Sequence, residues 1–191
     1  MHFLLLFRNK MILKNICLVF YSLFILSCLD QSGEDPPTSG EAFFTTKNED
    51  GKFSAFSFSE GKVIKYPNTQ GLNPDIMLMV HTNENGIPIG VFLVSLELKP
   101  TFSYKFWSSS IDSSQNYFDN LLVIPDTIFT GLALPIKENQ VWAVVTNGSR
   151  FGKILIKNTT AYIDSSDIHQ LTPYGEVRFK WEYQPDGSNI F

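Results

Sequence analysis

Apolar residues recur mostly at every second position of this chain, which is the period of a β-strand. The clearest run is 175–184, in which Val177, Phe179, Trp181 and Tyr183 alternate with charged side chains. This alternation predicts one face packed on a core and one face in water. Nine runs that are rich in β-branched and aromatic residues and bounded by turn residues are predicted as strands: 42–48, 52–59, 62–66, 75–82, 90–98, 127–134, 141–147, 153–163 and 175–184.

The turns and the lack of helical periodicity point to the same class. Asn-Gly pairs occur within 83–86 and 146–149, between apolar runs, where a residue with positive φ suits a hairpin. No stretch of twelve or more residues shows a 3.6-residue apolar period. The chain is therefore predicted to be all-β, an antiparallel β-sandwich-like assembly of about nine or ten strands.

Two of the predicted strands, 75–80 and 141–145, are apolar on both sides, which predicts interior strands covered on each face. In the first, Met77, Met79 and His81 fall in one row, because alternate residues of a strand point to one face. Thioethers and imidazole can bind soft metals or a heme iron. They can equally fill irregular space in a core. Both interpretations are open at this point.

Residues 99–120 break the strand pattern, being rich in Ser and Asn and studded with aromatic side chains. A connector of this length predicts a long loop of the kind that often carries function. Its aromatic residues could form a flat wall for a planar ligand or close the end of a sandwich. They are Tyr104, Phe106, Trp107, Tyr117 and Phe118.

The first 27 residues predict a lipoprotein signal peptide. Basic residues without any acid precede an apolar run that ends in "ILSC", which resembles the lipobox of bacterial lipoproteins with Cys28 as the lipidated residue. The stretch 28–41 is then the lipidated cysteine and a polar, flexible tether, and 42–191 a single β domain. This organisation predicts a lipid anchor at the bacterial outer membrane or cell surface.

Charge and composition exclude several functions. Without the leader, twelve basic residues face nineteen acidic ones, a net charge of −7, which disfavours nucleic-acid partners. Cys17 lies in the leader and Cys28 is predicted to carry lipid, so no disulfide is expected. No nucleophile, zinc or phosphate-binding motif occurs, and the aspartates lack the spacing of a calcium loop. We therefore expect neither an enzyme nor a catalytic or metal site.

Two stretches resemble the HmuY family of surface lipoproteins. "FSFSEGKVI" followed by "NPDIMLMV" is similar to the opening strands of that family, and "NQVWAVVTNGSRFGKILIKN" followed by "GEVRFKWEYQPDGS" is similar to its closing strands. The matches cover 53–82 and 139–187. The resemblance implies a β-rich, lipid-tethered fold that binds heme between two axial ligands and passes it to an outer-membrane transporter. Because the methionines fall in an early matched strand, it also favours a core role for Met77 and Met79.

The chain departs from the family at the ligands. Pro74 stands where the family usually has Trp, and 90–168 contains no His or Met. If heme or a related tetrapyrrole is the ligand, the candidate residues are therefore two histidines and two tyrosines, because tyrosinate also ligates ferric heme. They are His81, His169, Tyr104 and Tyr117.

The alternative is an HmuY-like scaffold without heme, which acts as a protein-interaction module at the cell surface. It would contact a host or envelope protein through the aromatic loop, chiefly Phe106, Trp107 and Phe118.

Overall fold

A computed structural model describes residues 35–48, 50–166 and 171–191 of the chain. This part contains nine strands, one α-helix and one short 3₁₀ turn. In chain order they are β1 (Ser39–Thr45), β2 (Phe53–Ser57), β3 (Lys62–Tyr66), β4 (Ile76–Thr82), β5 (Pro88–Val94), η1 (Leu96–Leu98), β6 (Phe102–Trp107), α2 (Ile111–Asn120), β7 (Gln140–Val145), β8 (Phe151–Asp164) and β9 (Thr172–Gln184).

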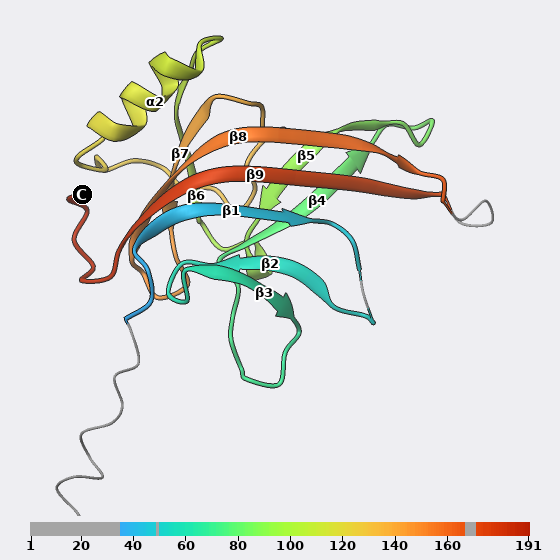
Figure 1. The fold of residues 1–191 in the computed structure, drawn as a ribbon, viewed down its shortest axis with the longest axis horizontal. Coiled ribbons are helices and arrows are strands. Elements are labelled where there is room, and N and C mark those ends of the chain that lie inside the picture. The colour runs from blue at the N-terminus through green and yellow to red at the C-terminus, as the bar shows by residue number, and fades with distance from the viewer. Residues whose placement is uncertain (1–34, 49, 167–170) are drawn as a thin grey trace, which may run out of the picture. The chain divides into compact units, whose positions relative to one another are not determined.

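The strands form two antiparallel sheets that pack as a sandwich (Figure 1). The large sheet has the order β1-β9-β8-β7-β6 and the small sheet the order β3-β2-β4-β5. The predicted Asn-Gly turns connect β4 to β5 and β7 to β8: the N–H of Gly86 donates to the carbonyl of Asn83, and that of Ser149 to Thr146. A mostly β, sandwich-like fold is thus confirmed, with one helix that the sequence did not predict.

An aromatic core lies between the inner faces of the two sheets. Val177, Phe179 and Trp181 of β9 are buried in it, as their alternation predicted. The ring of Phe56, on β2, has its centroid 5.3 Å from that of Phe179 and 5.2 Å from that of Trp181. Such pairs contribute about 0.5–1.5 kcal/mol each beyond the area they bury. These contacts across the sandwich fix one sheet against the other.

The run 127–134 does not form the predicted strand. Within it, Thr130 bridges to Phe102 at the edge of the large sheet, and Leu132 bridges to Val94 at the edge of the small sheet. The segment therefore crosses from one sheet to the other and closes that side of the sandwich. The segment is rich in β-forming residues, but it makes only isolated bridges, because it does not run alongside one sheet edge for its whole length.

Residues 99–120 are not a loop but the edge strand β6 and the helix α2. The helix begins after Ser110, whose side chain accepts a hydrogen bond from the N–H of Ser113 at 3.4 Å. Ser114 and Phe118 face inward and are buried. The loop prediction is wrong because a helix of ten residues owes its stability to packing on a sheet, which local sequence does not reveal.

The start of the domain also differs from its predicted position. Strand β1 begins at Ser39, opposite Glu182 of β9, so the last residues of the predicted tether 28–41 belong to the large sheet. The predicted signal peptide 1–27 and Cys28 lie outside the described residues. In the part that the structure describes, no helix is long and apolar enough to cross a membrane.

Candidate functional site

The row Met77, Met79 and His81 lies on the outer face of the small sheet, away from the core. The other row of β4 faces inward: Ile76 is fully buried, and Leu78 and Val80 pack against the core. Met77 is half-buried, Met79 is 36% exposed and His81 is exposed. The interpretation of both methionines as core residues is therefore wrong: among the described residues, no helix or second sheet covers this face as α2 covers the large sheet, and neither methionine belongs to a core cluster.

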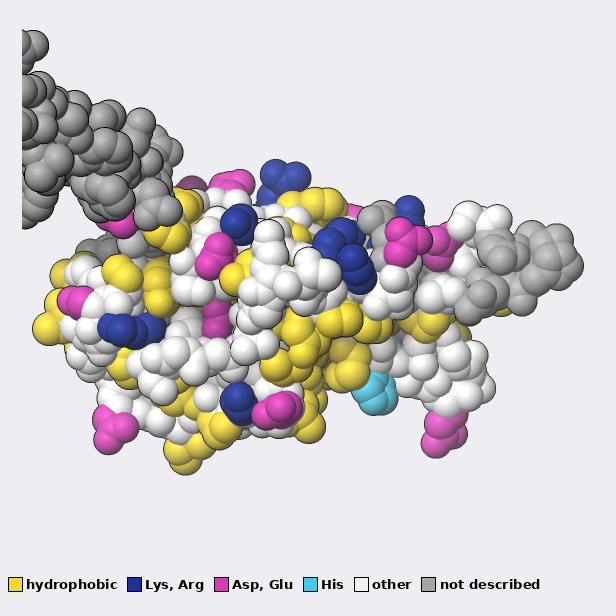
Figure 2. Space-filling view, turned by 90° about the horizontal axis from the view of Figure 1, so that it is seen from below, with side chains coloured by type: hydrophobic (Ala, Val, Ile, Leu, Met, Phe, Trp, Pro, Cys, Tyr) yellow, Lys and Arg dark blue, Asp and Glu magenta, His cyan; other side chains and the backbone are white. Residues whose placement is uncertain are grey.

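The neighbouring strands frame this row with small or apolar residues. Met77 pairs with Ala55 of β2, while Met79 pairs with Phe92 and His81 with Gly90 of β5. Ala55 and Phe92 are buried although they belong to the outer face. Figure 2, which views the side where β2 and β3 lie in Figure 1, shows hydrophobic side chains gathered among polar ones. The row thus stands on an apolar surface, which we call the β4 outer face.

The ring of His81 is oriented by its own strand. Its Nδ1 lies 3.1 Å from the carbonyl oxygen of Thr82, and its centroid lies 5.7 Å from that of Phe92. Because a carbonyl oxygen only accepts hydrogen bonds, Nδ1 carries the proton in the neutral ring. The lone pair then lies on Nε2, the atom that binds a metal or a heme iron.

The other predicted ligands do not converge on His81. Tyr117, on α2, stacks on Phe106 of β6 with centroids 4.4 Å apart and planes 7° apart. Tyr104, on β6, is 51% exposed and meets Trp142 edge-on at 5.3 Å. In Figure 1, α2 and the β4–β5 turn that follows His81 lie at opposite ends of the domain. His169 lies outside the described residues.

The predicted aromatic binding residues have two different environments. Phe118, on the inward side of α2, is fully buried. It packs in a cluster with Leu121, Val141 and Leu155, so its role is in the core. Trp107 is 49% exposed and donates a hydrogen bond from Nε1 to the carbonyl of Glu138 at 3.1 Å. Of the proposed loop wall, only Tyr104 and Trp107 present a large exposed surface.

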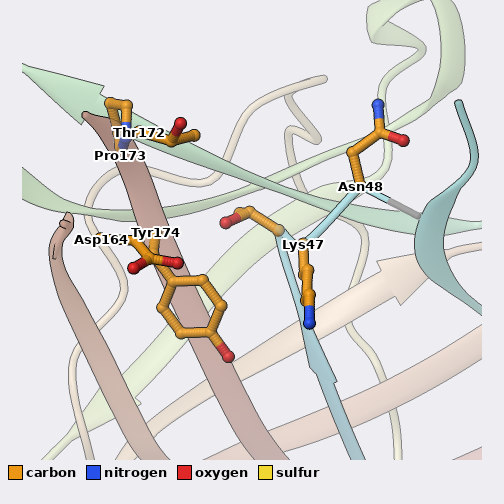
Figure 3. A pocket seen from close by; sticks show the side chains of 7 residues that line it. Lys47, Asn48, Asp164, Thr172, Pro173 and Tyr174 are labelled. Carbon is orange, nitrogen blue, oxygen red and sulfur yellow. The ribbon is translucent and has the colours of Figure 1, made fainter. Parts of the chain in front are cut away.

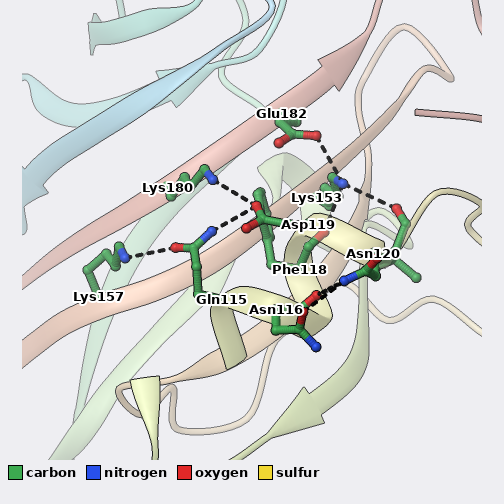
Figure 4. Close-up of polar contacts among 10 residues, drawn as sticks. Gln115, Asn116, Phe118, Asp119, Asn120, Lys153, Lys157, Lys180 and Glu182 are labelled. Carbon is green, nitrogen blue, oxygen red and sulfur yellow. Dashed lines mark hydrogen bonds and ion pairs between the residues drawn. The ribbon is translucent and has the colours of Figure 1, made fainter. Parts of the chain in front are cut away.

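A buried lysine that no sequence motif indicates anchors the helix (Figure 4). Lys153 of β8 is 1% exposed, and its Nζ lies 2.9 Å from Oε2 of Glu182. The same Nζ donates hydrogen bonds to the carbonyls of Phe118 at 2.9 Å and Leu121 at 3.2 Å. A cation at these carbonyls is favourable, because the last carbonyls of a helix carry partial negative charge. Since Nζ is occupied by one carboxylate and two helix carbonyls, we assign Lys153 a structural role.

A second polar cluster holds the exposed side of the same helix. Asp119 accepts hydrogen bonds from Gln115 at 2.8 Å and from Lys180 at 2.9 Å (Figure 4). Partial burial raises the pKa of Asp119, but these hydrogen bonds and the charges of Lys180 and Lys153 outweigh it and lower the pKa overall. Lys157 completes the cluster with a hydrogen bond to Gln115 at 3.1 Å.

Asp75, in the "NPD" sequence, is a buried carboxylate at the start of β4. Its two oxygens accept hydrogen bonds from the N–H of Phe58 at 2.9 Å and of Asn147 at 2.7 Å. Burial raises the pKa of Asp75, and the two backbone hydrogen bonds oppose this shift. Because both oxygens are occupied, the group joins the β7–β8 turn to the small sheet and is not placed to act as an acid or base.

A cavity of about 430 Å³ lies where β1 and β8 end and β9 begins (Figure 3). Lys47, Asp164 and Tyr174 surround it in this view. The N–H of Ser166 hydrogen-bonds the carboxylate of Asp164 and lowers its pKa. The cavity has the groups to hydrogen-bond a small polar molecule, but of the predicted site residues that the structure describes, none lines it. Its lining is Thr46, Lys47, Asn48, Asp164, Thr172, Pro173 and Tyr174.

Comparisons with known proteins do not decide between these places. No protein-family model matches the chain, and no curated protein is significantly similar to it. Within the described ranges, no group of three or more His, Cys, Asp or Glu side chains is arranged to hold a metal ion. The β4 outer face remains the place that combines an oriented imidazole with an exposed apolar surface.

Proposed function

We propose that this chain is a non-enzymatic, lipid-anchored surface protein with an HmuY-like scaffold, and that it binds heme or a related tetrapyrrole for iron acquisition. The observation that carries the proposal is His81, whose Nε2 is free to ligate and which stands exposed at the end of the β4 outer face. An axial imidazole together with an adjacent apolar surface is what a macrocycle of large apolar area requires.

The resemblance to HmuY supports this ligand. The similar segments 53–82 and 139–187 correspond to β2, β3 and β4 and to β7, β8 and β9. They contribute the interior strands of both sheets and the edge strand β3 of the small sheet. His81 follows directly after the matched strand "NPDIMLMV", which ends at Val80. A tetrapyrrole on the β4 outer face would contact the methionines with its ring and His81 with its iron.

The leader supports the location. A signal peptide in 1–27, lipid on Cys28 and a short tether would hold the domain at the outer membrane or cell surface. There, an outer-membrane heme transporter is the partner that fits a heme carrier.

The test is a hemin titration of the full chain in detergent, followed by ferric and ferrous absorption spectra. We expect a saturable one-to-one change with a sharpened Soret band, and a loss of most of the affinity in His81→Ala. His169→Ala is the matched comparison. Loss of binding in His169→Ala alone would move the ligand to the second histidine, and no saturable change in the natural chain would refute the tetrapyrrole.

The second candidate is the protein-interaction module without heme. It is favoured by Tyr104 and Trp107, two large aromatic side chains that are each about half exposed on the edge strand β6. Aromatic residues of this kind dominate protein–protein contacts. This alternative predicts that the natural chain binds no hemin but can be cross-linked to a host or envelope protein. It also predicts that Trp107→Ala loses that cross-link.

A further inference from the structure

We propose that the cavity where β1 and β8 end and β9 begins is a binding site for one neutral pyranose sugar. Its volume of about 430 Å³ is within the range of about 300–1,000 Å³ that small-molecule sites occupy. Its lining supplies an aromatic ring, a carboxylate, an ammonium group, an amide and threonine hydroxyls. A pyranose carries hydroxyl groups around a ring whose faces expose C–H groups, so it requires this combination of polar groups and an aromatic surface.

Tyr174, on β9, provides the surface on which a sugar ring can pack. Its side chain is half-buried and lines the cavity. The ring of Tyr162, its partner on β8, lies beside it with centroids 4.7 Å apart and planes inclined by 41°. Tyr162 is 46% exposed, so the aromatic surface extends beyond the cavity. The faces of aromatic rings are electron-rich and attract the C–H groups of a sugar.

Asp164, at the end of β8, provides the acceptor for a sugar hydroxyl. Its Oδ1 accepts a hydrogen bond from the N–H of Ser166 at 2.9 Å, which orients the carboxylate and lowers its pKa. An ionised carboxylate has about four acceptor sites, so this bond leaves capacity for a hydroxyl donor. Hydrogen bonds to an ionised group are roughly twice as strong as neutral ones. Asp164 is therefore the strongest polar contact that the cavity offers to a sugar.

The charges of the lining favour a neutral ligand. Lys47 and Asp164 both line the cavity, and in Figure 3 they lie on either side of the Tyr174 ring. A charged ligand would be attracted by one of these groups and repelled by the other. A hydroxyl can donate to the carboxylate and accept from the ammonium group, so a sugar can use both without carrying a charge.

The segment that carries Lys47 is fixed to β9. The N–H of Thr46 donates to the carbonyl of Gly175 at 2.8 Å, and the N–H of Gly175 donates to the hydroxyl of Thr46 at 2.9 Å. These two bonds continue the pairing of β1 with β9 by one residue, which brings Lys47 level with Tyr174. A site that is held in place before its ligand arrives loses less entropy on binding.

This inference goes beyond the proposed function and does not depend on it. The described residues that line the cavity include none from β4 or β5, which carry His81 and its neighbours. Hemin binding and sugar binding are therefore separate measurements. Failure of one leaves the other standing.

The test uses the full chain in a detergent without sugar groups, labelled with ¹³C in its tyrosine rings, of which there are seven. The probes are the methyl glycosides of glucose, galactose, mannose and N-acetylglucosamine at millimolar concentration. Tyr174→Phe removes one tyrosine resonance and so identifies that of Tyr174. We expect at least one glycoside to shift the Tyr174 resonance saturably and to receive magnetisation from the protein in saturation-transfer spectra.

Four variants locate the site. Tyr174→Ala should bind the glycoside about tenfold more weakly, because it loses the aromatic contact, whereas Tyr174→Phe keeps the ring and should retain most of the affinity. Asp164→Asn keeps an oxygen for the N–H of Ser166 but loses the charge, and should weaken binding several-fold. Asp126→Asn removes an exposed aspartate outside the lining and should bind as the natural chain does.

The outcomes are distinct. A Tyr174 resonance that none of the four glycosides shifts would overturn the proposal, and so would a shift caused by L-serine, a zwitterion, instead of the glycosides. Undiminished glycoside binding in both Tyr174→Ala and Asp164→Asn would place the sugar elsewhere and also overturn it. Absence of saturation transfer to all four glycosides is measured on the natural chain, so it decides against the proposal even if a variant fails to fold.

Discussion

Strands β7 and β4 are both apolar on two faces, yet only β7 is covered on both. The outer residues of β7 lie under helix α2, where Val141 joins a cluster with Phe118, Leu121 and Leu155. The outer residues of β4 have no such cover, and Met79 is 36% exposed. A two-sided apolar strand therefore has two explanations: a second layer of packing, or a surface kept apolar for a ligand.

The composition of the two outer rows agrees with this distinction. Beneath α2 the row of β7 contains Val141 and Ala143, which pack but offer no ligand atoms. On β4 the outer row contains two thioethers and an imidazole, each able to bind a soft ion. The covered face contributes to stability, and the uncovered face is where we place binding.

The largest expected effect is on the covered face. Phe118→Ala removes a fully buried ring from between α2 and the large sheet. We expect the free energy of unfolding to fall by about 3–5 kcal/mol, the usual cost of a buried Phe→Ala change. Urea denaturation measures this, with Met79→Ala on the uncovered face as the matched variant, for which we expect a much smaller loss. Equal losses at the two positions would contradict the distinction between the faces.

A somewhat smaller loss of folding stability is expected at Lys153, which anchors helix α2 to the large sheet. Lys153→Met keeps the bulk of the side chain but leaves the Glu182 carboxylate and two helix carbonyls without their cation. Loss of one partner of a buried ion pair costs about 3–5 kcal/mol, and the partial exposure of Glu182, 29%, places this case at the lower end. Lys157→Met, on the same strand but less buried, is the control. A free energy of unfolding unchanged in Lys153→Met would show that α2 is held by its apolar face alone.

These contacts show where sequence reasoning succeeds and where it stops. The alternation of Val177, Phe179 and Trp181 correctly predicted an inward face of β9, because the period of a strand is a local property. Whether the second face of β4 or β7 is covered depends on another segment, and no local pattern reveals it. The helix that covers β7 was missed for the same reason: its stability comes from the sheet below it.

The candidate site divides along the same line. The sequence correctly placed Met77, Met79 and His81 in one row. It wrongly assigned the methionines to the core, because the sequence of a strand that is apolar on both faces does not reveal which face is the inner one. Lys153 and Asp75 gave no signal. Their roles arise from carbonyls and N–H groups that lie distant in the sequence.

The smallest expected change in folding stability is at Asp75, which links strand β4 to the turn between β7 and β8. Asp75, at the start of β4, holds the turn that follows β7, and burial raises its pKa. A carboxyl whose pKa is higher in the folded chain stabilises fully below the unfolded pKa and loses that contribution as pH rises through the folded pKa.

Asp75→Asn cannot titrate, so comparison with it isolates this contribution. The free energy of unfolding of the natural chain, minus that of the variant, should fall as pH rises from about 4, by about 1.4 kcal/mol for each unit by which the pKa is raised. Urea denaturation across this pH range measures the difference. A difference that is flat or that grows with pH would contradict the raised pKa.

The pairing of β1 with β9 sets the order in which the chain can fold. Ser39 lies opposite Glu182, so nearly the whole described chain separates the two strands. Strands β8 and β9 are neighbours along the chain and can meet early, whereas β1 must wait for β9 to be synthesised. Until then Phe44 has no sheet to join, and the N-terminal part of the domain stays open.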